Sequence, residues 1–271
     1  MTQEVAFRSG NLVLRGELYL PARERASGIL VCHAMHAEGF RWLPLYRTFA
    51  EKACQRGFAC LLFDLRGCGK SEGKFDYGWG EQEDARAAFE FLLSRKEVNP
   101  TGAYVVGRSL GGTIALYALA GDSRVRGFAL WATPPDHYTN IRNFIIGRFG
   151  MFRYLSFLAL SYVDRIHDVG KAVRIELFGL KLRLNDLRFK TMTLRGARLL
   201  SGMQHPPVLL LIGDKDEYVS LQEIERFKNA IGGRVRSQIL ENTGHTFKGA
   251  EDLATEATLQ WFEELSQRQE T

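Results

Sequence analysis

Short apolar segments alternate with amphipathic helical segments along most of the chain, and this alternation constrains the fold more than any other feature. The apolar segments, which are typical of buried strands, cover residues 28–34, 58–64, 103–107, 125–132 and 208–213, and a further strand is expected at residues 234–240. The segments with helical spacing cover residues 42–57, 80–96, 110–120, 221–232 and 251–265. Because strands that are apolar throughout must be covered on both faces, the pattern predicts an α/β fold with a mostly parallel central sheet and helices on both faces.

Two regions depart from this alternation. Residues 4–20 alternate in strand fashion around a polar turn at residues 9–11, which predicts a β-hairpin. Residues 134–205 instead combine Phe, Tyr and Leu with Arg at helical spacing. We therefore predict one α/β core, residues 1–133 and 206–271, with a helical lid of residues 134–205, here called the insertion, between the sixth and seventh core strands. A chain of 271 residues suits one such domain.

The composition indicates a globular protein. With 45% hydrophobic and 25% charged residues, it excludes a disordered, collagen-like or coiled-coil chain. We expect no transmembrane segment, because no apolar run approaches the roughly 18–20 residues that span a bilayer, and no secretory signal at the N-terminus. The cysteines lack the C-x-x-C spacing of metal or redox sites, which favours reduced thiols in a cytoplasmic protein. They are Cys32, Cys54, Cys60 and Cys68.

Positive charge is concentrated in the insertion. The whole chain has a net charge of +5, but residues 137–200 contain 12 Lys and Arg against 4 Asp and Glu. Such an excess attracts anionic partners, and we expect an acidic carrier protein or another anionic substrate rather than nucleic acid, because no nucleic-acid-binding motif accompanies it. The alternative is that these residues form only a solvated helix face.

The segment Gly107-Arg108-Ser109-Leu110-Gly111-Gly112 lies between a predicted strand and a predicted helix. A serine on such a sharp strand-to-helix turn requires small neighbours, since the helix begins directly against the strand. The N-terminus of that helix also offers free backbone N–H groups beside the hydroxyl. This G-x-S-x-G pattern predicts that Ser109 is a nucleophile; otherwise Ser109 only caps the helix.

A nucleophilic serine needs a base, and the base needs a carboxylate that orients it. His245 follows the last predicted strand and is preceded by a glycine, which makes it the candidate base. For the acid we favour Asp216, three residues beyond the glycine that ends the strand at 208–213, over Asp214 and over Asp136, which follows the sixth strand. These side chains all follow parallel strands at their carboxyl ends, where open α/β sheets carry their sites.

These motifs together resemble those of the α/β-hydrolase superfamily. The segment Asp64–Ser71 resembles the D-x-R-G-x-G-x-S loop of many members, and the resemblance extends over both sides of the insertion. The sequences around Asp216 and His245 resemble the acid and histidine loops, although Ser220 replaces the usual proline. The resemblance implies an α/β-hydrolase fold and a Ser109–His245–Asp216 triad. The most similar sub-groups are serine-aminopeptidase or lysophospholipase-like hydrolases and small esterases and thioesterases.

The resemblance also implies an oxyanion hole, which needs two backbone N–H donors. Leu110, directly after the nucleophile, supplies one, and the family pattern assigns the other to Met35. The family usually has glycine where this chain has Ala34. His36 and Arg108, which flank these positions, are candidate substrate contacts, and a surface or supporting role is the alternative for His36.

We predict no catalytic metal and no cofactor. His33 and His36 have the spacing of a metal-binding pair, but no carboxylate or cysteine at ligand spacing completes a site. Gly69-Lys70-Ser71 matches the end of the phosphate-binding loop motif, but the position at which that motif requires its first glycine is occupied by Asp64.

The predicted chemistry is acyl transfer to water through an acyl-enzyme. We expect a carboxylic ester or thioester substrate, either a small molecule or an acyl chain on an anionic carrier, because the insertion is both apolar and basic. Peptidase, carbon–carbon hydrolase and acyltransferase activities use the same triad and remain open. A protein with this fold that binds a partner without catalysis is the remaining alternative.

Overall fold

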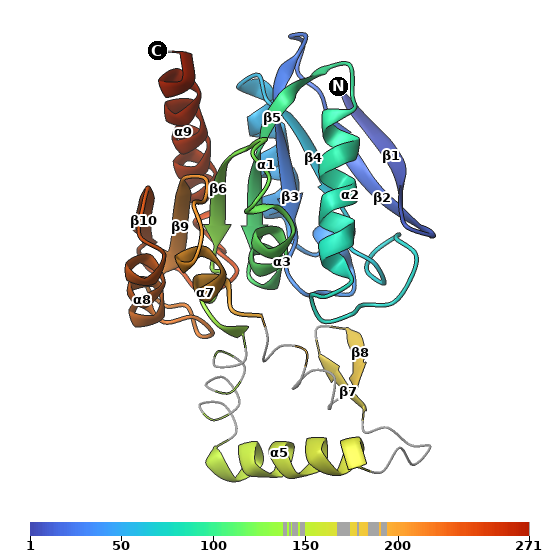
Figure 1. The fold of residues 1–271 in the computed structure, drawn as a ribbon, viewed down its shortest axis with the longest axis vertical. Helices are drawn as coiled ribbons and strands as arrows, with labels where there is room; N and C mark the ends of the chain where they lie inside the picture. Colours follow the sequence, from blue (N-terminus) through green and yellow to red (C-terminus); the bar gives the residue numbers. More distant parts are fainter. Residues whose placement is uncertain are drawn as a thin grey trace.

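A computed structural model describes residues 1–137, 140, 142, 146, 150–166, 174–177, 179–183, 190 and 194–270. In this part of the chain the core is an eight-stranded sheet with the strand order β1-β2-β4-β3-β5-β6-β9-β10 (Figure 1). The strands are β1 Thr2–Ser9, β2 Leu12–Tyr19, β3 Ala26–Cys32, β4 Ala59–Phe63, β5 Val98–Arg108, β6 Val125–Trp131, β9 Val208–Gly213 and β10 Val235–Leu240. The predicted strands are therefore confirmed, and β5 begins five residues earlier than expected.

The sheet is antiparallel at one edge and parallel elsewhere. The hairpin β1–β2 pairs through β2 with β4 in antiparallel fashion, and the six strands from β4 to β10 are parallel to their neighbours. The parallel strands β3, β4, β6 and β9 are almost completely buried because helices cover both faces of the sheet, whereas the edge strand β10 is partly exposed. The α/β-hydrolase fold predicted from the sequence is thus confirmed.

Helices α1 and α9 pack together on one face of the sheet, and α2, α3 and α8 cover the other (Figure 1). The helices of the core are α1 Pro44–Gln55, α2 Glu81–Leu93, α3 Leu110–Leu119, α8 Leu221–Ile231 and α9 Glu251–Glu270, and α7 Gly196–Ser201 belongs to the insertion. A short 3-10 helix, η1 Gly39–Trp42, precedes α1, which begins at Pro44 because proline fits the first turn of a helix.

The parallel strands all end at the edge of the core that faces the insertion (Figure 1). The last residue of β3, Cys32, pairs with Gly107 of β5, and Arg108 pairs with Trp131 at the end of β6. At the far side Gly213 of β9 pairs with Leu240 of β10. This register brings the loops that follow β3, β5, β9 and β10 to one edge of the sheet.

The described part of the insertion contains more than helix. Helix α5, Met151–Ile166, agrees with the predicted helical packing, but β7 Arg174–Leu177 and β8 Leu180–Arg183 form an antiparallel hairpin that we did not predict. Helix α7 packs on α3 and α8, so the end of residues 134–205 lies against the core. The domain boundaries stay a prediction.

The insertion contacts the core beside the loop after β3. Leu180 packs with Cys68 and Tyr77 in a small apolar cluster that Met35 also joins. The indole Nε1 of Trp79 donates a hydrogen bond of 3.2 Å to the carbonyl oxygen of Lys190. These contacts place the insertion over the edge of the sheet where the strand-end loops converge.

Candidate active site

Ser109 occupies a sharp turn between β5 and α3. Its backbone has φ 51° and ψ −125°, a conformation that non-glycine residues rarely adopt, and its N–H donates a 2.9 Å hydrogen bond to the carbonyl oxygen of Trp131. The glycines nearby are required by close packing: a Cβ on Gly111 would lie 2.2 Å from the carbonyl oxygen of His33. A Cβ on Gly107 would lie 2.4 Å from the Cα of Gly112. The predicted strand–serine–helix turn is present.

His245 and Asp216 form a hydrogen-bonded pair in the loops after β10 and β9. The imidazole Nδ1 lies 3.0 Å and 2.9 Å from the two carboxylate oxygens, and the Asp216 side chain is fully buried. The backbone N–H groups of Tyr218 and Val219 each donate a 2.9 Å hydrogen bond to Asp216 Oδ1. In the tautomer that carries its proton on Nδ1, the imidazole would donate to this carboxylate and leave Nε2 available to accept a proton.

The other two candidate acids have different partners. Asp214 Oδ1 accepts a 3.0 Å hydrogen bond from the Thr243 N–H, and this bond lowers the pKa of the Asp214 carboxyl. Asp136 lies 3.6 Å from Arg195 in an ion pair. Of the three carboxylates weighed in the sequence analysis, Asp216 is the one that faces the His245 imidazole.

The loop of His245 is tied to the turn of Ser109 by the residue before the serine. Arg108 Nη2 donates a 2.6 Å hydrogen bond to the carbonyl oxygen of His245. Within the described residues, Ser109 Oγ and His245 form no hydrogen bond with each other. Such bonds are often long in a ligand-free active site and shorten when substrate binds.

The two candidate oxyanion donors lie on segments in contact. Leu110 is the first residue of α3, and the first turn of α3 packs on the end of β3, shortly before Met35. Neither the Leu110 N–H nor the Met35 N–H donates a hydrogen bond to another described residue. Ala34 is accommodated without a positive φ, and its N–H donates a 3.0 Å hydrogen bond to the Tyr46 hydroxyl.

The two candidate substrate contacts, His36 and Arg108, both pack against the ring of Trp42. His36 stacks on Trp42 with a centroid separation of 4.4 Å and an interplanar angle of 9°. The Arg108 guanidinium carbon lies 5.5 Å from the centroid of the Trp42 ring. His36 is partly exposed, whereas Arg108 is fully buried and its described contacts are all to the protein.

Sequence reasoning missed three residues that surround His245. Tyr218 contacts the His245 ring at a centroid distance of 4.7 Å, and the His245 N–H donates a 3.2 Å hydrogen bond to Glu217 Oε2. His137, just beyond β6, is buried, and burial together with the nearby His245 lowers the pKa of His137 to about 3, so its imidazole is neutral. Proximity in sequence to Asp216 and Asp136 was the only available signal for these residues.

His33, which has the spacing of a metal-binding pair with His36, has partners within the protein. His33 is fully buried, its Nδ1 lies 2.6 Å from the Ala34 carbonyl oxygen, and its Nε2 lies 3.0 Å from the Leu65 nitrogen. Burial also lowers the pKa of His33, so the ring is neutral and joins the loops after β3 and β4. Among the described residues no group of three or more His, Cys, Asp or Glu side chains is arranged to hold a metal ion.

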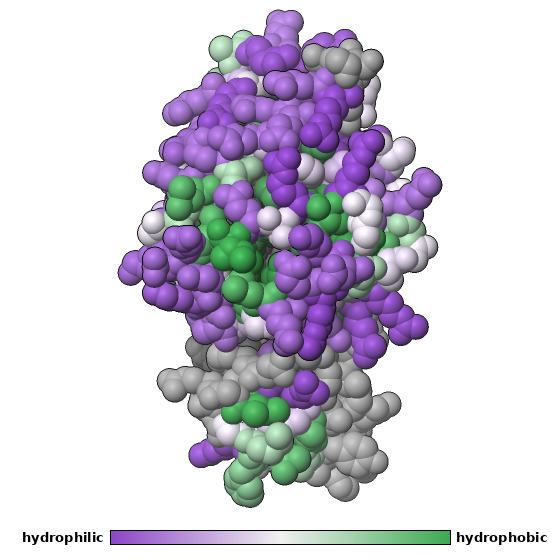
Figure 2. All heavy atoms as spheres, turned by 90° about the vertical axis from the view of Figure 1, so that its left-hand side faces the viewer, coloured by the Kyte–Doolittle hydropathy of each residue, from purple (hydrophilic) through white to green (hydrophobic). Residues whose placement is uncertain are grey.

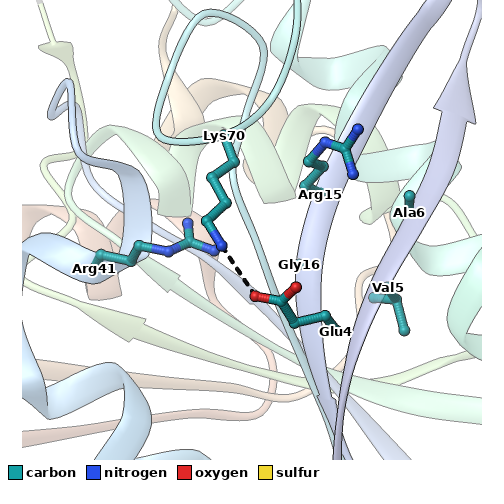
Figure 3. A pocket seen from close by; sticks show the side chains of 7 residues that line it. All are labelled: Glu4, Val5, Ala6, Arg15, Gly16, Arg41 and Lys70. Atoms are coloured by element: carbon teal, nitrogen blue, oxygen red, sulfur yellow. Dashed lines mark hydrogen bonds and ion pairs between the residues drawn. The ribbon is translucent and has the colours of Figure 1, made fainter.

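A cavity of about 580 Å³ lies away from this site, beside the β1–β2 hairpin (Figure 3). It is lined by Glu4, Val5, Ala6, Arg15, Gly16, Arg41 and Lys70. Two of its cations are paired, since Lys70 Nζ lies 2.9 Å from Glu4 and Arg41 pairs with the buried Asp64. The carboxylate of Asp64 also accepts a 2.9 Å hydrogen bond from the Lys70 N–H, which fixes the D-x-R-G-x-G-x-S loop.

Comparisons with known proteins agree with this architecture. The model of the Alpha/beta hydrolase family matches residues 29–254. The quorum-quenching protein AidA of Acinetobacter baumannii is 33% identical over 126 residues, which are 45% of this chain and 40% of AidA, so the match spans less than half of either protein.

Two solved structures share the fold over nearly the whole chain. The alpha/beta hydrolase GrgF from Penicillium superposes with a TM-score of 0.77 at 19% identity, covering 99% of this chain and 98% of GrgF. The Pyrococcus furiosus esterase PF2001 gives a TM-score of 0.70 at 17% identity, covering 99% and 91%. At these identities the likeness concerns the fold alone.

Proposed function

The chain belongs to the alpha/beta hydrolase family, and on this premise we propose that it is a serine hydrolase that cleaves a carboxylic ester or thioester. The observation that carries the proposal is the buried Asp216–His245 hydrogen bond, held beside the Ser109 turn by the bond from Arg108 to the His245 carbonyl. The names of AidA, a quorum-quenching protein, and of the PF2001 esterase are compatible with hydrolysis but identify no substrate for this chain.

In the first half of the proposed reaction, Ser109 Oγ attacks the carbonyl carbon while His245 Nε2 accepts the hydroxyl proton. Asp216 holds the imidazole in the tautomer that makes Nε2 a base and stabilises the imidazolium that forms. The tetrahedral oxyanion accepts hydrogen bonds from the Leu110 and Met35 N–H groups. The bond to the leaving alcohol or thiol then breaks, and His245 donates its proton to that group.

In the second half a water molecule replaces the leaving group. His245 Nε2 accepts a proton from the water as its oxygen attacks the acyl-enzyme carbonyl, and the same N–H groups stabilise the second oxyanion. The acid product departs and Ser109 Oγ recovers its proton from His245. Because every step uses protein groups and water, the proposal requires no cofactor.

For the substrate we propose an apolar acyl chain attached to an anionic group, such as an acidic carrier protein. Helix α5 begins with exposed apolar side chains next to the exposed Arg153: Met151 is 54% exposed, Phe152 80% and Leu155 54%. Figure 2 shows an apolar area on the described part of the insertion and a second apolar area on the core surface above it. A surface that carries apolar and basic groups favours a ligand that combines an apolar chain with an anionic group.

No helix among the described residues has the length and apolarity to cross a membrane. The four cysteines are free, which is compatible with a reducing compartment, and we propose a cytoplasmic setting on that ground.

A panel of p-nitrophenyl esters and acyl-thioesters tests the proposal. We expect wild type to hydrolyse at least one class and Ser109→Ala to lose on the order of 10⁴-fold in kcat. The matched control is Ser123→Ala, an exposed serine, which should keep full activity. For the anionic preference, kcat/KM for succinyl esters should fall as salt is raised, and kcat/KM for butyryl esters should not.

Full hydrolysis by Ser109→Ala would contradict the assignment of the nucleophile. Equal salt dependence for the two esters would contradict the anionic substrate and leave the serine chemistry intact.

A further inference from the structure

Arg108 is a buried cation without a carboxylate partner. Its side chain is fully buried, and no carboxylate among the described residues lies within ion-pair distance of it. Its Nε and Nη1 atoms are buried and have no hydrogen-bond partner. Burying a charge in this way costs free energy unless other interactions compensate. A group that lowers stability and is nevertheless present at a site of proposed chemistry calls for a functional explanation.

The interactions that Arg108 does make connect three loops of the site. Nη2 donates its 2.6 Å hydrogen bond to the backbone of His245, and the guanidinium lies over the face of Trp42 in η1. Trp42 also stacks on His36, which directly follows the proposed oxyanion residue Met35. Since Arg108 itself precedes Ser109, the contacts of Arg108, Trp42 and His36 connect the loops that carry the proposed nucleophile, base and oxyanion donor.

We propose that Arg108 is a positioning residue. It holds the backbone of His245, and through it the imidazole, in the position that the reaction with Ser109 requires. This inference rests on the proposed serine hydrolase function. The hydrogen bond fixes one end of the histidine loop, and the Nδ1 bond to Asp216 fixes the imidazole itself. Together these two hydrogen bonds would set the position of His245 Nε2 relative to Ser109. A displacement of a catalytic group by about 1 Å can lower the rate about a hundredfold.

The buried position distinguishes this role from substrate binding. A residue that contacts substrate contributes to KM, whereas a residue that only orients the base contributes to kcat. The Arg108 guanidinium contacts the Trp42 ring and the His245 backbone, and none of the residue is exposed. We therefore expect kcat to fall and KM to remain when the guanidinium is removed.

The test compares Arg108→Met and Arg108→Lys with wild type by steady-state kinetics, and by the rate at which a fluorophosphonate labels Ser109. Methionine removes every donor, so kcat and the labelling rate should fall together by about tenfold to a hundredfold at unchanged KM. Lysine keeps the charge and one donor nitrogen, so Arg108→Lys should recover part of the loss. The melting temperature of each variant shows whether it is folded.

The matched control is Arg236→Met. Arg236 also lies over a tryptophan, 4.8 Å from the Trp261 ring, and donates 3.0 Å and 2.8 Å hydrogen bonds to Glu264, but on the β10–α9 side of the core. The Arg236→Met variant should retain the kcat of wild type. If Arg108→Met does not fold, Arg108→Lys decides the question by the same comparison of kcat with KM.

Three results would overturn the inference: wild-type kcat in a folded Arg108→Met, a rise in KM alone, or an equal loss of kcat in Arg236→Met. Failure of the proposed function itself would be seen separately, because wild type would then not be labelled at Ser109.

Discussion

At the scale of single residues, the carboxylate that faces His245 decides which tautomer its imidazole adopts. Asp216 combines full side-chain burial, two backbone N–H donors and the bond to His245 Nδ1. Asp214, two residues earlier, directs its carboxylate to the Thr243 N–H instead. Only the first arrangement can hold the Nδ1 proton and stabilise an imidazolium.

Replacement of each aspartate by asparagine separates these roles. Asp216→Asn should lower kcat by about 10⁴-fold, because the amide favours the wrong imidazole tautomer. Asp214→Asn should leave kcat unchanged, since asparagine keeps the oxygen that accepts from the Thr243 N–H. Steady-state kinetics on the best ester measure both, and similar losses in the two variants would contradict the assignment of the acid.

Residues placed by strand ends were predictable from the sequence, and residues placed by side-chain contact were not. His245 and Asp216 each follow a parallel strand, so topology brings them to one edge, and the structure places them within hydrogen-bond distance. Their roles stay predictions. The contacts of Trp42 with His36 and with Arg108 depend on how η1 folds back on the site, and no spacing in the sequence encodes them.

At the scale of elements, the turn between β5 and α3 depends on how closely α3 approaches β3. The missing side chain of Gly111 allows the first turn of α3 to pack on the carbonyl groups of Cys32 and His33. Since the same turn carries Ser109 and Leu110, this contact sets the distance between the nucleophile and the oxyanion loop.

Addition of one methyl group tests this packing. Gly111→Ala should lower the free energy of unfolding by about 3 kcal/mol and impair activity, because its Cβ meets rigid backbone at 2.2 Å and 2.4 Å. Gly202→Ala is the control: no atom lies within 4 Å of its Cβ, and its φ is −100°. Urea unfolding measures both variants, and equal stability of Gly111→Ala and wild type would contradict the close approach.

Most elements of the core were predictable because β3, β4, β6 and β9 are apolar almost throughout, the β1–β2 hairpin alternates, and helices such as α1 and α8 are amphipathic. The β7–β8 hairpin was missed because its residues, Arg174–Leu177 and Leu180–Arg183, mix Lys and Arg with apolar residues and carry no turn signal except Gly179. Residues 138, 139 and 143–145, also predicted as part of the lid, lie outside the described residues.

At the scale of the whole molecule, the sheet order gathers the loops after β3, β5, β9 and β10 at one edge, and the insertion contacts that edge through Leu180 and Lys190. The core is mildly acidic and residues 137–200 are strongly basic, and our proposal of an anionic ligand rests on this contrast in charge. Charge and topology were both readable from the sequence, whereas the contacts between insertion and core required the structure.

Labelling with a fluorophosphonate, read by intact mass and peptide mapping, tests the central claim most directly because it needs no knowledge of the substrate. We predict a single adduct on Ser109 of wild type, absent from Ser109→Ala and lost when His245→Ala removes the base. An unlabelled, folded wild-type protein, or an adduct at another serine, would contradict the claim that Ser109 is an activated nucleophile.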